Sequence, residues 1–146
     1  MATLEREPTP PRPLATPRRG LVVVVEDDAT LRELVAEHLQ HIGFEVAAVA
    51  NGDAALAIVR ERHPDLLCID VNLPSVSGFD LCEHIRGDSS LNDVAILMMS
   101  ASVLLEARAY SFEAGADGYL RKPYTLGQLT SEITRLLDGP RSARRR

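Results

Sequence analysis

Side chains that can bind a cation or a phosphate follow four separate apolar segments of this sequence: Glu26-Asp27-Asp28, Asp70, Ser100 and Lys122. If the acids meet they repel one another, because two negative charges about 4 Å apart cost roughly 4 kcal/mol at an effective dielectric constant of about 20. One lysine cannot offset three carboxylates. A hard divalent cation can, and magnesium prefers a few carboxylates together with water and a phosphate oxygen. These residue types therefore predict a magnesium site that brings a phosphate to a carboxylate.

The spacing of apolar residues predicts the elements that must position these groups. Five short segments are expected to form strands: 21–25, 44–49, 66–69, 94–99 and 118–120. Apolar residues recur at helical spacing between and after them, over 31–42, 51–63, 77–87, 104–114 and from 125 onward. Alternating strands and helices favour right-handed crossovers and a parallel sheet covered on both sides. The expected fold class is therefore a doubly wound α/β domain.

In such a domain the strand ends are the positions where a ligand is expected. Doubly wound sheets bind ligands beyond the carboxyl ends of their strands, near the point where the strand order reverses. The acids, the hydroxyl and the ammonium each follow a different predicted strand. We therefore expect them to converge on one edge of the sheet, a coincidence that helix caps alone do not explain.

Four segments resemble, in order, the motifs of receiver domains from bacterial two-component response regulators: residues 24–32, 70–78, 99–101 and 118–123. Each motif alone is a weak signal, but the ordered set is specific. The likeness covers residues 20–139, nearly all of the part of the chain that is expected to fold. It implies a flavodoxin-like sheet of five parallel strands in the order 2-1-3-4-5, with five helices.

The resemblance also implies a role for each acidic position. Asp70 is similar to the aspartate that accepts a phosphoryl group, and it also faces the metal. Asp27 resembles a direct magnesium ligand, whereas Glu26 resembles one that acts mainly through water. Asn72 is expected to offer its backbone carbonyl to the ion. Asp28 is more simply explained as the N-cap of the following helix than as a ligand.

A second group of residues is expected to act on the phosphoryl group. Ser100 resembles the hydroxyl that hydrogen-bonds it, and Lys122 the ammonium that pairs with it. Tyr119 stands at the family's aromatic switch position, although plain packing at a sheet edge also explains a tyrosine there. Pro123 is expected to follow a cis peptide bond. Arg32 is expected to be a solvated or ion-paired helix residue.

These likenesses imply a phosphoacceptor switch rather than an enzyme. The expected donor is a histidine kinase or a phosphotransfer protein. The phosphoryl group is expected to draw Ser100 inward and let Tyr119 turn from exposed to buried, which biases the face of the fourth helix, fifth strand and fifth helix. That face is the expected docking surface for a downstream protein, and a homodimer formed on phosphorylation is left open. With no output domain after residue 139, the chain is expected to be a stand-alone receiver or a fragment.

Three other functions fit the sequence less well. An aspartate-nucleophile phosphohydrolase needs a second aspartate two residues after the nucleophile, where this chain has Asn72, and its nucleophile usually follows the first strand. A receiver-like module that is not phosphorylated typically lacks the acids or the lysine, which this chain retains. A nucleotide-binding domain is disfavoured because neither G-x-G-x-x-G nor G-x-x-x-x-G-K-[ST] occurs.

The charges divide the chain into an acidic body and basic ends. Residues 20–140 hold eight Lys/Arg against 19 Asp/Glu, a net charge of −11, which makes nucleic acid a poor partner. The Pro/Arg-rich segment 1–19 and the basic segment 140–146 are expected to be disordered tails, although contacts with RNA, DNA or an acidic partner are left open.

The apolar and cysteine patterns bear on where the chain works. No apolar run reaches the length of about 18 residues that a membrane span needs, and the N-terminal segment does not resemble a secretory signal. Cys68 and Cys82 are not in metal-ligand spacing and are expected to be reduced, buried thiols of a cytoplasmic protein.

Overall fold

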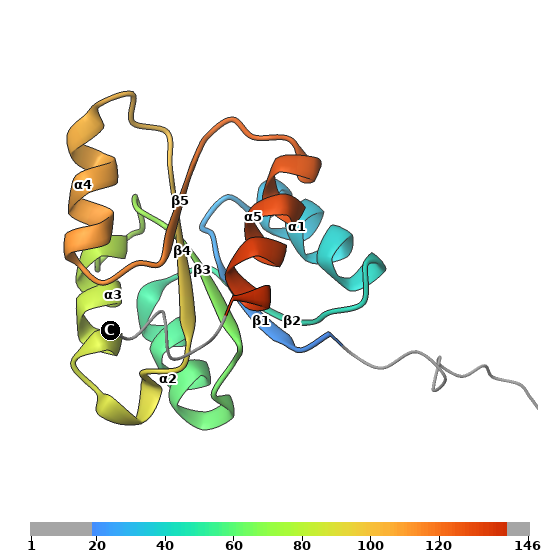
Figure 1. The fold of residues 1–146 in the computed structure, drawn as a ribbon, viewed down its shortest axis with the longest axis horizontal. Coiled ribbons are helices and arrows are strands. Elements are labelled where there is room, and N and C mark those ends of the chain that lie inside the picture. The colour runs from blue at the N-terminus through green and yellow to red at the C-terminus, as the bar shows by residue number, and fades with distance from the viewer. Residues whose placement is uncertain (1–18, 140–146) are drawn as a thin grey trace, which may run out of the picture.

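A computed structural model describes residues 19–139 of the chain (Figure 1). Its elements follow in the order β1 (Leu21–Val25), α1 (Ala29–His41), β2 (Glu45–Val49), α2 (Gly52–Arg62), β3 (Leu66–Asp70), α3 (Gly78–Arg86), the 3₁₀ helix η2 (Ser89–Leu91), β4 (Ala95–Ser100), α4 (Leu105–Glu113), β5 (Gly118–Arg121) and α5 (Leu126–Asp138). Each predicted strand and helix is confirmed, with differences only at the ends. The short helix η2 was not predicted, because three residues are too few to show an apolar period.

The five strands form one parallel sheet in the order β2-β1-β3-β4-β5. Strand order therefore reverses between β1 and β3, because the chain first builds outward to β2 and then returns past β1. The doubly wound fold and its strand order are confirmed. The carboxyl ends of β1 and β3, which are neighbours at this reversal, are the place where the fold opens a ligand site.

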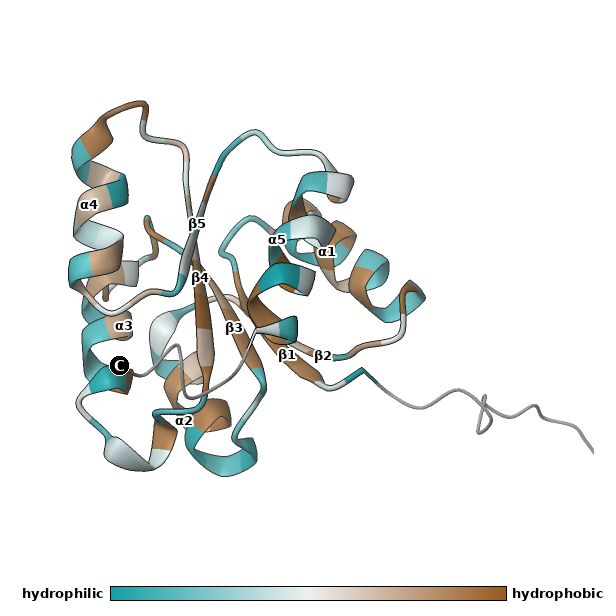
Figure 2. Cartoon of the chain, viewed as in Figure 1, coloured by the Kyte–Doolittle hydropathy of each residue, from teal (hydrophilic) through white to brown (hydrophobic). Residues whose placement is uncertain are grey.

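Helices cover both faces of the sheet (Figure 1). The helices α1 and α5 pack on one face through Val35, Leu39, Leu129 and Ile133, and α2 and α3 pack on the other. Successive β1 residues serve opposite faces: Val22 and Val24 belong to the α1–α5 side, whereas Val23 and Val25 belong to the α2–α3 side. This explains why β1 is apolar at every position, and why most of the length of the central strands is coloured as hydrophobic in Figure 2.

Side-chain caps fix where the helices begin. Asn51, Ser77 and Thr125 each accept a backbone N–H from the first turn of α2, α3 and α5 respectively. At the start of α5 the Gln128 side chain also accepts the Thr125 N–H, which completes a capping box. These caps hold the loops between strands and helices, and those loops carry the polar groups of interest.

The predicted tails, 1–19 and 140–146, lie outside the described residues except for Arg19. The Arg19 guanidinium lies 4.7 Å from the centroid of the Phe44 ring, and its backbone N–H donates to the carbonyl of Gly43. Among the described helices, none combines the length and the apolar character that crossing a membrane requires.

Candidate functional site

The strand register brings the predicted polar residues to one edge of the sheet. Glu26 follows the last paired residue of β1 and comes level with Asp70, the last residue of β3. Ser100 ends β4 one position beyond the partner of Asp70, and Lys122 directly follows β5. Parallel pairing therefore delivers residues that are distant in the sequence to the same rim.

Lys122 joins two of the acids. Its Nζ donates to Oε1 of Glu26 at 2.8 Å and to Oδ2 of Asp70 at 2.9 Å. The Glu26 and Asp70 side chains are 2% and 7% exposed, and that of Lys122 is 18% exposed. Burial by itself lowers the pKa of Lys122, but the hydrogen bonds to the two carboxylates outweigh it and raise the pKa above its ordinary value. Lys122 is therefore an ammonium at neutral pH.

Burial has the largest effect on the Glu26 carboxyl group. Burial raises the pKa of Glu26, and the nearby Asp70 charge adds to the effect, although hydrogen bonds from Lys122 and from the Asp28 backbone N–H oppose it. That backbone N–H lies 3.1 Å from Oε2 of Glu26. The net effect is a raised pKa, because the cost of burying the Glu26 carboxylate exceeds what these hydrogen bonds contribute.

Asp27 completes a group of three carboxylates that fits a divalent cation. One oxygen each from Glu26, Asp27 and Asp70 lies within 4.8 Å of the others, and Asp27 itself is exposed. All three donors are hard oxygens, as magnesium prefers. Lys122 already engages one oxygen of Glu26 and one of Asp70, so a bound cation has the exposed Asp27 carboxylate and the remaining Asp70 oxygen nearby.

The loop that carries Glu26 and Asp27 is held by side chains from its own helix. Asp28 is the N-cap of α1, as expected, and its Oδ1 accepts the Leu31 N–H at 3.0 Å. Arg32 was expected to be solvated or ion-paired, but its guanidinium bonds backbone carbonyls instead. Its Nη1 donates to the carbonyl oxygen of Glu26 at 2.8 Å and to that of Asp27 at 3.4 Å. Sequence spacing gave no signal for these bonds.

The loop after β3 packs closely behind Asp70. The backbone N–H of Asn72 donates to Oδ1 of Asp70 at 3.0 Å. Gly78, the first residue of α3, approaches so closely that a Cβ there would lie 2.5 Å from the carbonyl oxygen of Asp70. Only glycine permits this approach, which explains the residue in structural terms. Ser77 before it is the N-cap of α3.

Ser100 begins a chain of hydrogen bonds that reaches α4. Its buried Oγ accepts the backbone N–H of Ser102 at 3.0 Å, and Oγ of Ser102 accepts the N–H of Leu104 at 3.1 Å. Leu104 is the N-cap residue of α4 and makes no side-chain cap. The start of α4 is thus connected to the Ser100 hydroxyl by two successive bonds.

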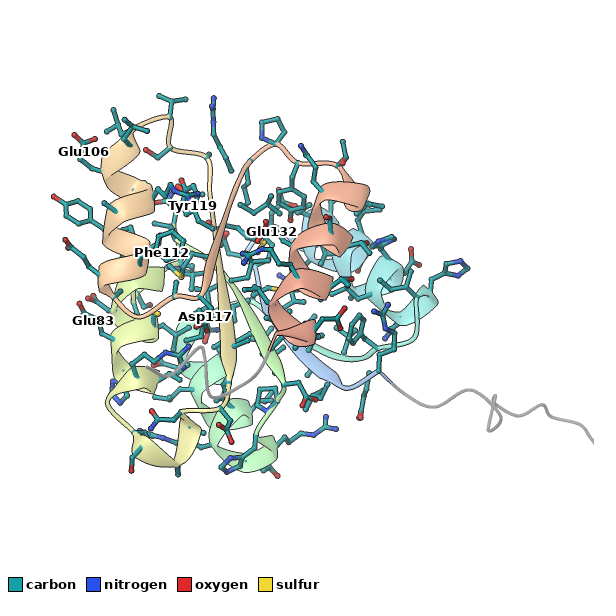
Figure 3. The ribbon with its side chains drawn as sticks, in the orientation of Figure 1. Glu83, Glu106, Phe112, Asp117, Tyr119 and Glu132 are labelled. Carbon is teal, nitrogen blue, oxygen red and sulfur yellow. The ribbon has the colours of Figure 1, made fainter. Side chains whose placement is uncertain are left out.

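Two tyrosines near the site bury their hydroxyl groups without a hydrogen-bond partner among the described residues, Tyr119 and Tyr124. The Tyr119 ring packs against the core on the α2–α3 side, and in Figure 3 it lies between β5 and α4. Tyr124 lines a cavity of about 550 Å³ beside Lys122, together with Leu31 and Val103. The burial of the Tyr124 hydroxyl was not predicted. The peptide bond between Lys122 and Pro123 is cis, as expected.

Comparisons with known proteins agree with this geometry. The family described as response regulator receiver domain matches residues 22–134. The chain is 30% identical over 116 residues to the DNA-binding dual master transcriptional regulator RpaA of Synechocystis, covering 80% of this chain and 48% of that protein. It is 36% identical over 115 residues to the DNA-binding response regulator MtrA of Mycobacterium bovis, covering 79% and 49%. The chain spans about half the length of the curated relatives it matches.

Solved structures of similar domains match over nearly their whole length. The chemotaxis response regulator CheY4 of Vibrio cholerae is 31% identical, with a TM-score of 0.77, over 84% of this chain and 100% of that one. The signal receiver domain of a signal transduction histidine kinase from Syntrophus aciditrophicus is 30% identical, with a TM-score of 0.76, over 82% and 91%. The fold, the carboxylate edge and the match over residues 22–134 lead to one conclusion: this chain belongs to the family of response regulator receiver domains.

Proposed function

We propose that the chain is a phosphoacceptor switch in which the Asp70 carboxylate takes a phosphoryl group in a magnesium-dependent reaction. The observation that carries this proposal is the bridge from Lys122 to Asp70, set beside a second and third carboxylate. An acid that is held against a fixed ammonium and next to a cation-binding group is suited to receive a dianion.

The transfer step needs positioning more than acid–base chemistry. A carboxylate oxygen of Asp70 attacks the phosphorus of a phosphohistidine in line, a P–O bond forms, and the P–N bond breaks with its electron pair leaving on the imidazole. Lys122 offsets charge on the phosphoryl oxygens, and the Ser100 hydroxyl donates a hydrogen bond to one of them. The product is an acyl phosphate, and water later attacks its phosphorus to release inorganic phosphate and restore the carboxylate.

Magnesium fits the acidic group as a resident cofactor. Asp27 and Asp70 would hold it directly, Glu26 through water, and Asn72 through its backbone carbonyl. When bound, the ion supplies a hard positive centre that offsets the charge of the incoming phosphoryl oxygens. The crowding of three acids supports this assignment, because like charges this close repel one another unless a cation lies between them.

The domain is proposed to be a substrate and switch and not an enzyme acting on a separate substrate. An aspartate-nucleophile phosphohydrolase would use a carboxylic acid two residues after the nucleophile to protonate the leaving group. Asn72 cannot do this, because an amide has no acidic proton at neutral pH. Partner proteins are therefore proposed to supply the phosphoryl group, as histidine kinases or phosphotransfer proteins, and to receive the signal.

We propose that the signal leaves the site through the chain of bonds from Ser100 to α4. If Ser100 turns toward a phosphoryl group, the Ser102 N–H loses its acceptor, and the start of α4 loses its tie to the site. Tyr119 packs beside this path and is proposed to change its packing with the same movement. The coupling needs no new element, because loop and helix are already joined.

The face made by α4, β5 and α5 is the proposed docking surface for a downstream protein. Leu105 is 83% exposed and Phe112 is 40% exposed, and α4 buries only Ala107 and Ser111. A weakly packed helix with exposed apolar side chains can change position at low cost and offers area to a partner. A phosphorylation-dependent homodimer would use the same kind of surface.

The buried thiols of Cys68 and Cys82 support a reducing location such as the cytoplasm. The proposed function itself is tested by incubating the chain with magnesium and acetyl phosphate and measuring its mass. The wild type is expected to gain one phosphoryl group, and Asp70→Asn is expected to gain none. Asp53→Asn is the matched control, because Asp53 is exposed in the first turn of α2. An equal gain in all three proteins would contradict the proposal.

A further inference from the structure

Arg32 reaches back from the first turns of α1 to the loop that carries two of the three acids. Its Nη1 lies 2.8 Å from the carbonyl oxygen of Glu26 and 3.4 Å from that of Asp27. Only residues 26–28 separate the last residue of β1 from the first residue of α1. One guanidinium therefore ties two of the three peptide carbonyls of this connection to the helix.

The other bonds of this loop act on different atoms. The Asp28 N–H donates to the Glu26 carboxylate, and the Asp28 carboxylate accepts the Leu31 N–H. These bonds fix the Glu26 side chain and the helix start. The carbonyls of Glu26 and Asp27 have Arg32 as their side-chain donor, so the peptide units on both sides of the Asp27 Cα are oriented by this residue. The direction in which the exposed Asp27 carboxylate leaves the loop follows from that orientation.

A restraint is needed here because the loop holds like charges. Glu26, Asp27 and Asp28 are consecutive acids, and mutual repulsion favours backbone conformations that spread them apart. An arginine is suited to oppose this, since it remains charged and its planar fork presents several donors at fixed angles. A lysine presents a single compact ammonium on a flexible stem, which restrains two carbonyls less well.

We propose that Arg32 is a positioning residue that holds Asp27 and Glu26 in their cation-binding arrangement. It does not touch the metal or the phosphoryl group, and it acts through the loop carbonyls. This inference rests on the proposed function, because it assigns a role in the same magnesium-dependent site.

The direction in which magnesium affinity changes when Arg32 is removed separates a positioning role from that of a nearby charge that does not take part. A cation fixed near a metal site repels the metal, so removal of a bystander arginine tightens magnesium binding. Removal of a positioning arginine weakens magnesium binding, because the free loop must be ordered when the ion binds. Loss of residues that orient metal ligands typically costs about 10- to 100-fold in affinity.

The test compares the wild type with Arg32→Gln, Arg32→Lys and the control Arg60→Gln, whose side chain bonds to His84 between α2 and α3. Magnesium dissociation constants come from titration calorimetry, and amide exchange at Asp27 and Asp28 is measured without magnesium. We expect Arg32→Gln to weaken magnesium binding by about tenfold and to speed amide exchange in the loop. Arg32→Lys should lie between it and the wild type, and Arg60→Gln should match the wild type.

Phosphorylation at saturating magnesium is the second readout. Arg32→Gln should then approach the wild-type mass gain with acetyl phosphate, because the lost step is ordering of the loop and not transfer. Unchanged or tighter magnesium binding in Arg32→Gln, with wild-type loop exchange, would overturn the role of Arg32 and leave the proposed function intact. A wild type that neither binds magnesium nor gains a phosphoryl group would overturn both. If Arg32→Gln does not fold, Arg32→Lys decides by the same two measurements.

Discussion

The ammonium nitrogen of Lys122 lies 2.9 Å from Oδ2 of Asp70, although 52 positions separate the two residues in the chain. The same nitrogen also bonds Glu26, which is 96 positions away. Three strand ends are thereby joined by one side chain. Lys122 is therefore expected to stabilise the folded domain as well as to take part in its proposed chemistry. The two roles can be measured separately.

Lys122→Met should destabilise the folded chain and slow phosphorylation. The change leaves the buried Glu26 and Asp70 carboxylates without their shared cation, which we expect to cost about 2 kcal/mol at pH 7, less than for a fully buried pair. Phosphorylation by acetyl phosphate should fall by about 100-fold. Lys122→Arg keeps the charge and should lose much less stability. Urea unfolding and mass spectrometry measure the two effects.

The loss of stability caused by Lys122→Met should depend on pH in a defined direction. Burial raises the pKa of Glu26 above its unfolded value, so its contribution to stability is present below that unfolded value and is lost as pH rises through the folded one. Removal of the ammonium raises the folded pKa of Glu26 further. The stability difference between wild type and Lys122→Met should therefore shrink when pH falls from 7 to 5. A difference that grows on acidification would contradict the assigned pairing.

Magnesium should raise the melting temperature of the wild type. A ligand that binds only the folded form at ten times its dissociation constant adds about 1.4 kcal/mol, a shift of several degrees for a domain of this size. Asp27→Asn removes an exposed ligand and should abolish most of the shift, and in EDTA it should melt at or slightly above the wild type because a like charge is lost. Asp53→Asn should keep the full shift. Identical curves with and without magnesium in the wild type would show that the acids are not a metal site.

Phosphorylation should loosen the start of α4. We expect faster amide exchange over residues 102–107 when magnesium and acetyl phosphate are added, because the Ser102 N–H loses the Ser100 oxygen. Ser100→Ala should show fast exchange there even without a phosphodonor. Asp70→Asn serves as the control and should not respond to the donor. Exchange that slows, or that changes equally in Asp70→Asn, would count against this route for the signal.

Tyr124→Phe should not reduce the stability of the folded chain at pH 7. At alkaline pH its stability should fall less steeply with pH than that of the wild type. The Tyr124 hydroxyl is buried with no hydrogen-bond partner among residues 19–139, so its removal costs no bond and relieves an unpaired polar group. Burial raises the pKa of Tyr124 to about 12. The unfolded chain therefore releases the phenolic proton first, and stability falls as pH rises from about 10 toward 12.

Cys68 also makes the stability of the folded chain fall with pH over an overlapping pH range, because burial raises the pKa of its thiol to about 12. The Tyr124→Phe comparison is therefore best made in a Cys68→Ala background, by chemical unfolding at several pH values. A large loss of stability at pH 7 in Tyr124→Phe, or an unchanged slope above pH 10, would contradict this account of the buried hydroxyl.

The fold could be predicted from the sequence because the apolar patterns of the strands and of the helices indicated the same architecture. Short apolar runs predicted the buried strands, and apolar residues at helical spacing predicted the helices between them. The acidic edge was also predictable, because parallel strands bring their carboxyl ends together. Asp28 as a cap followed from its residue type and its place before a helix, whereas the cis bond before Pro123 was implied by the resemblance to receiver domains.

The contacts that could not be predicted from the sequence depend on how side chains meet in three dimensions. The bonds of Arg32 join residues five and six positions apart in a loop, a spacing with no helical or strand period. The second bond of Lys122, to Glu26, depends on the register of strands at opposite ends of the chain. Burial of the Tyr124 hydroxyl depends on how a loop folds over the α1 face, which residue type does not specify.

The central claim is that Asp70 itself receives the phosphoryl group. The most direct test treats the chain with acetyl phosphate and magnesium, reduces it with borohydride, and maps the product by tandem mass spectrometry. Borohydride converts an aspartyl phosphate to homoserine, so homoserine is expected at position 70 and nowhere else. Homoserine at position 27, or a chain that keeps aspartate at every position despite a gain in mass, would contradict the account.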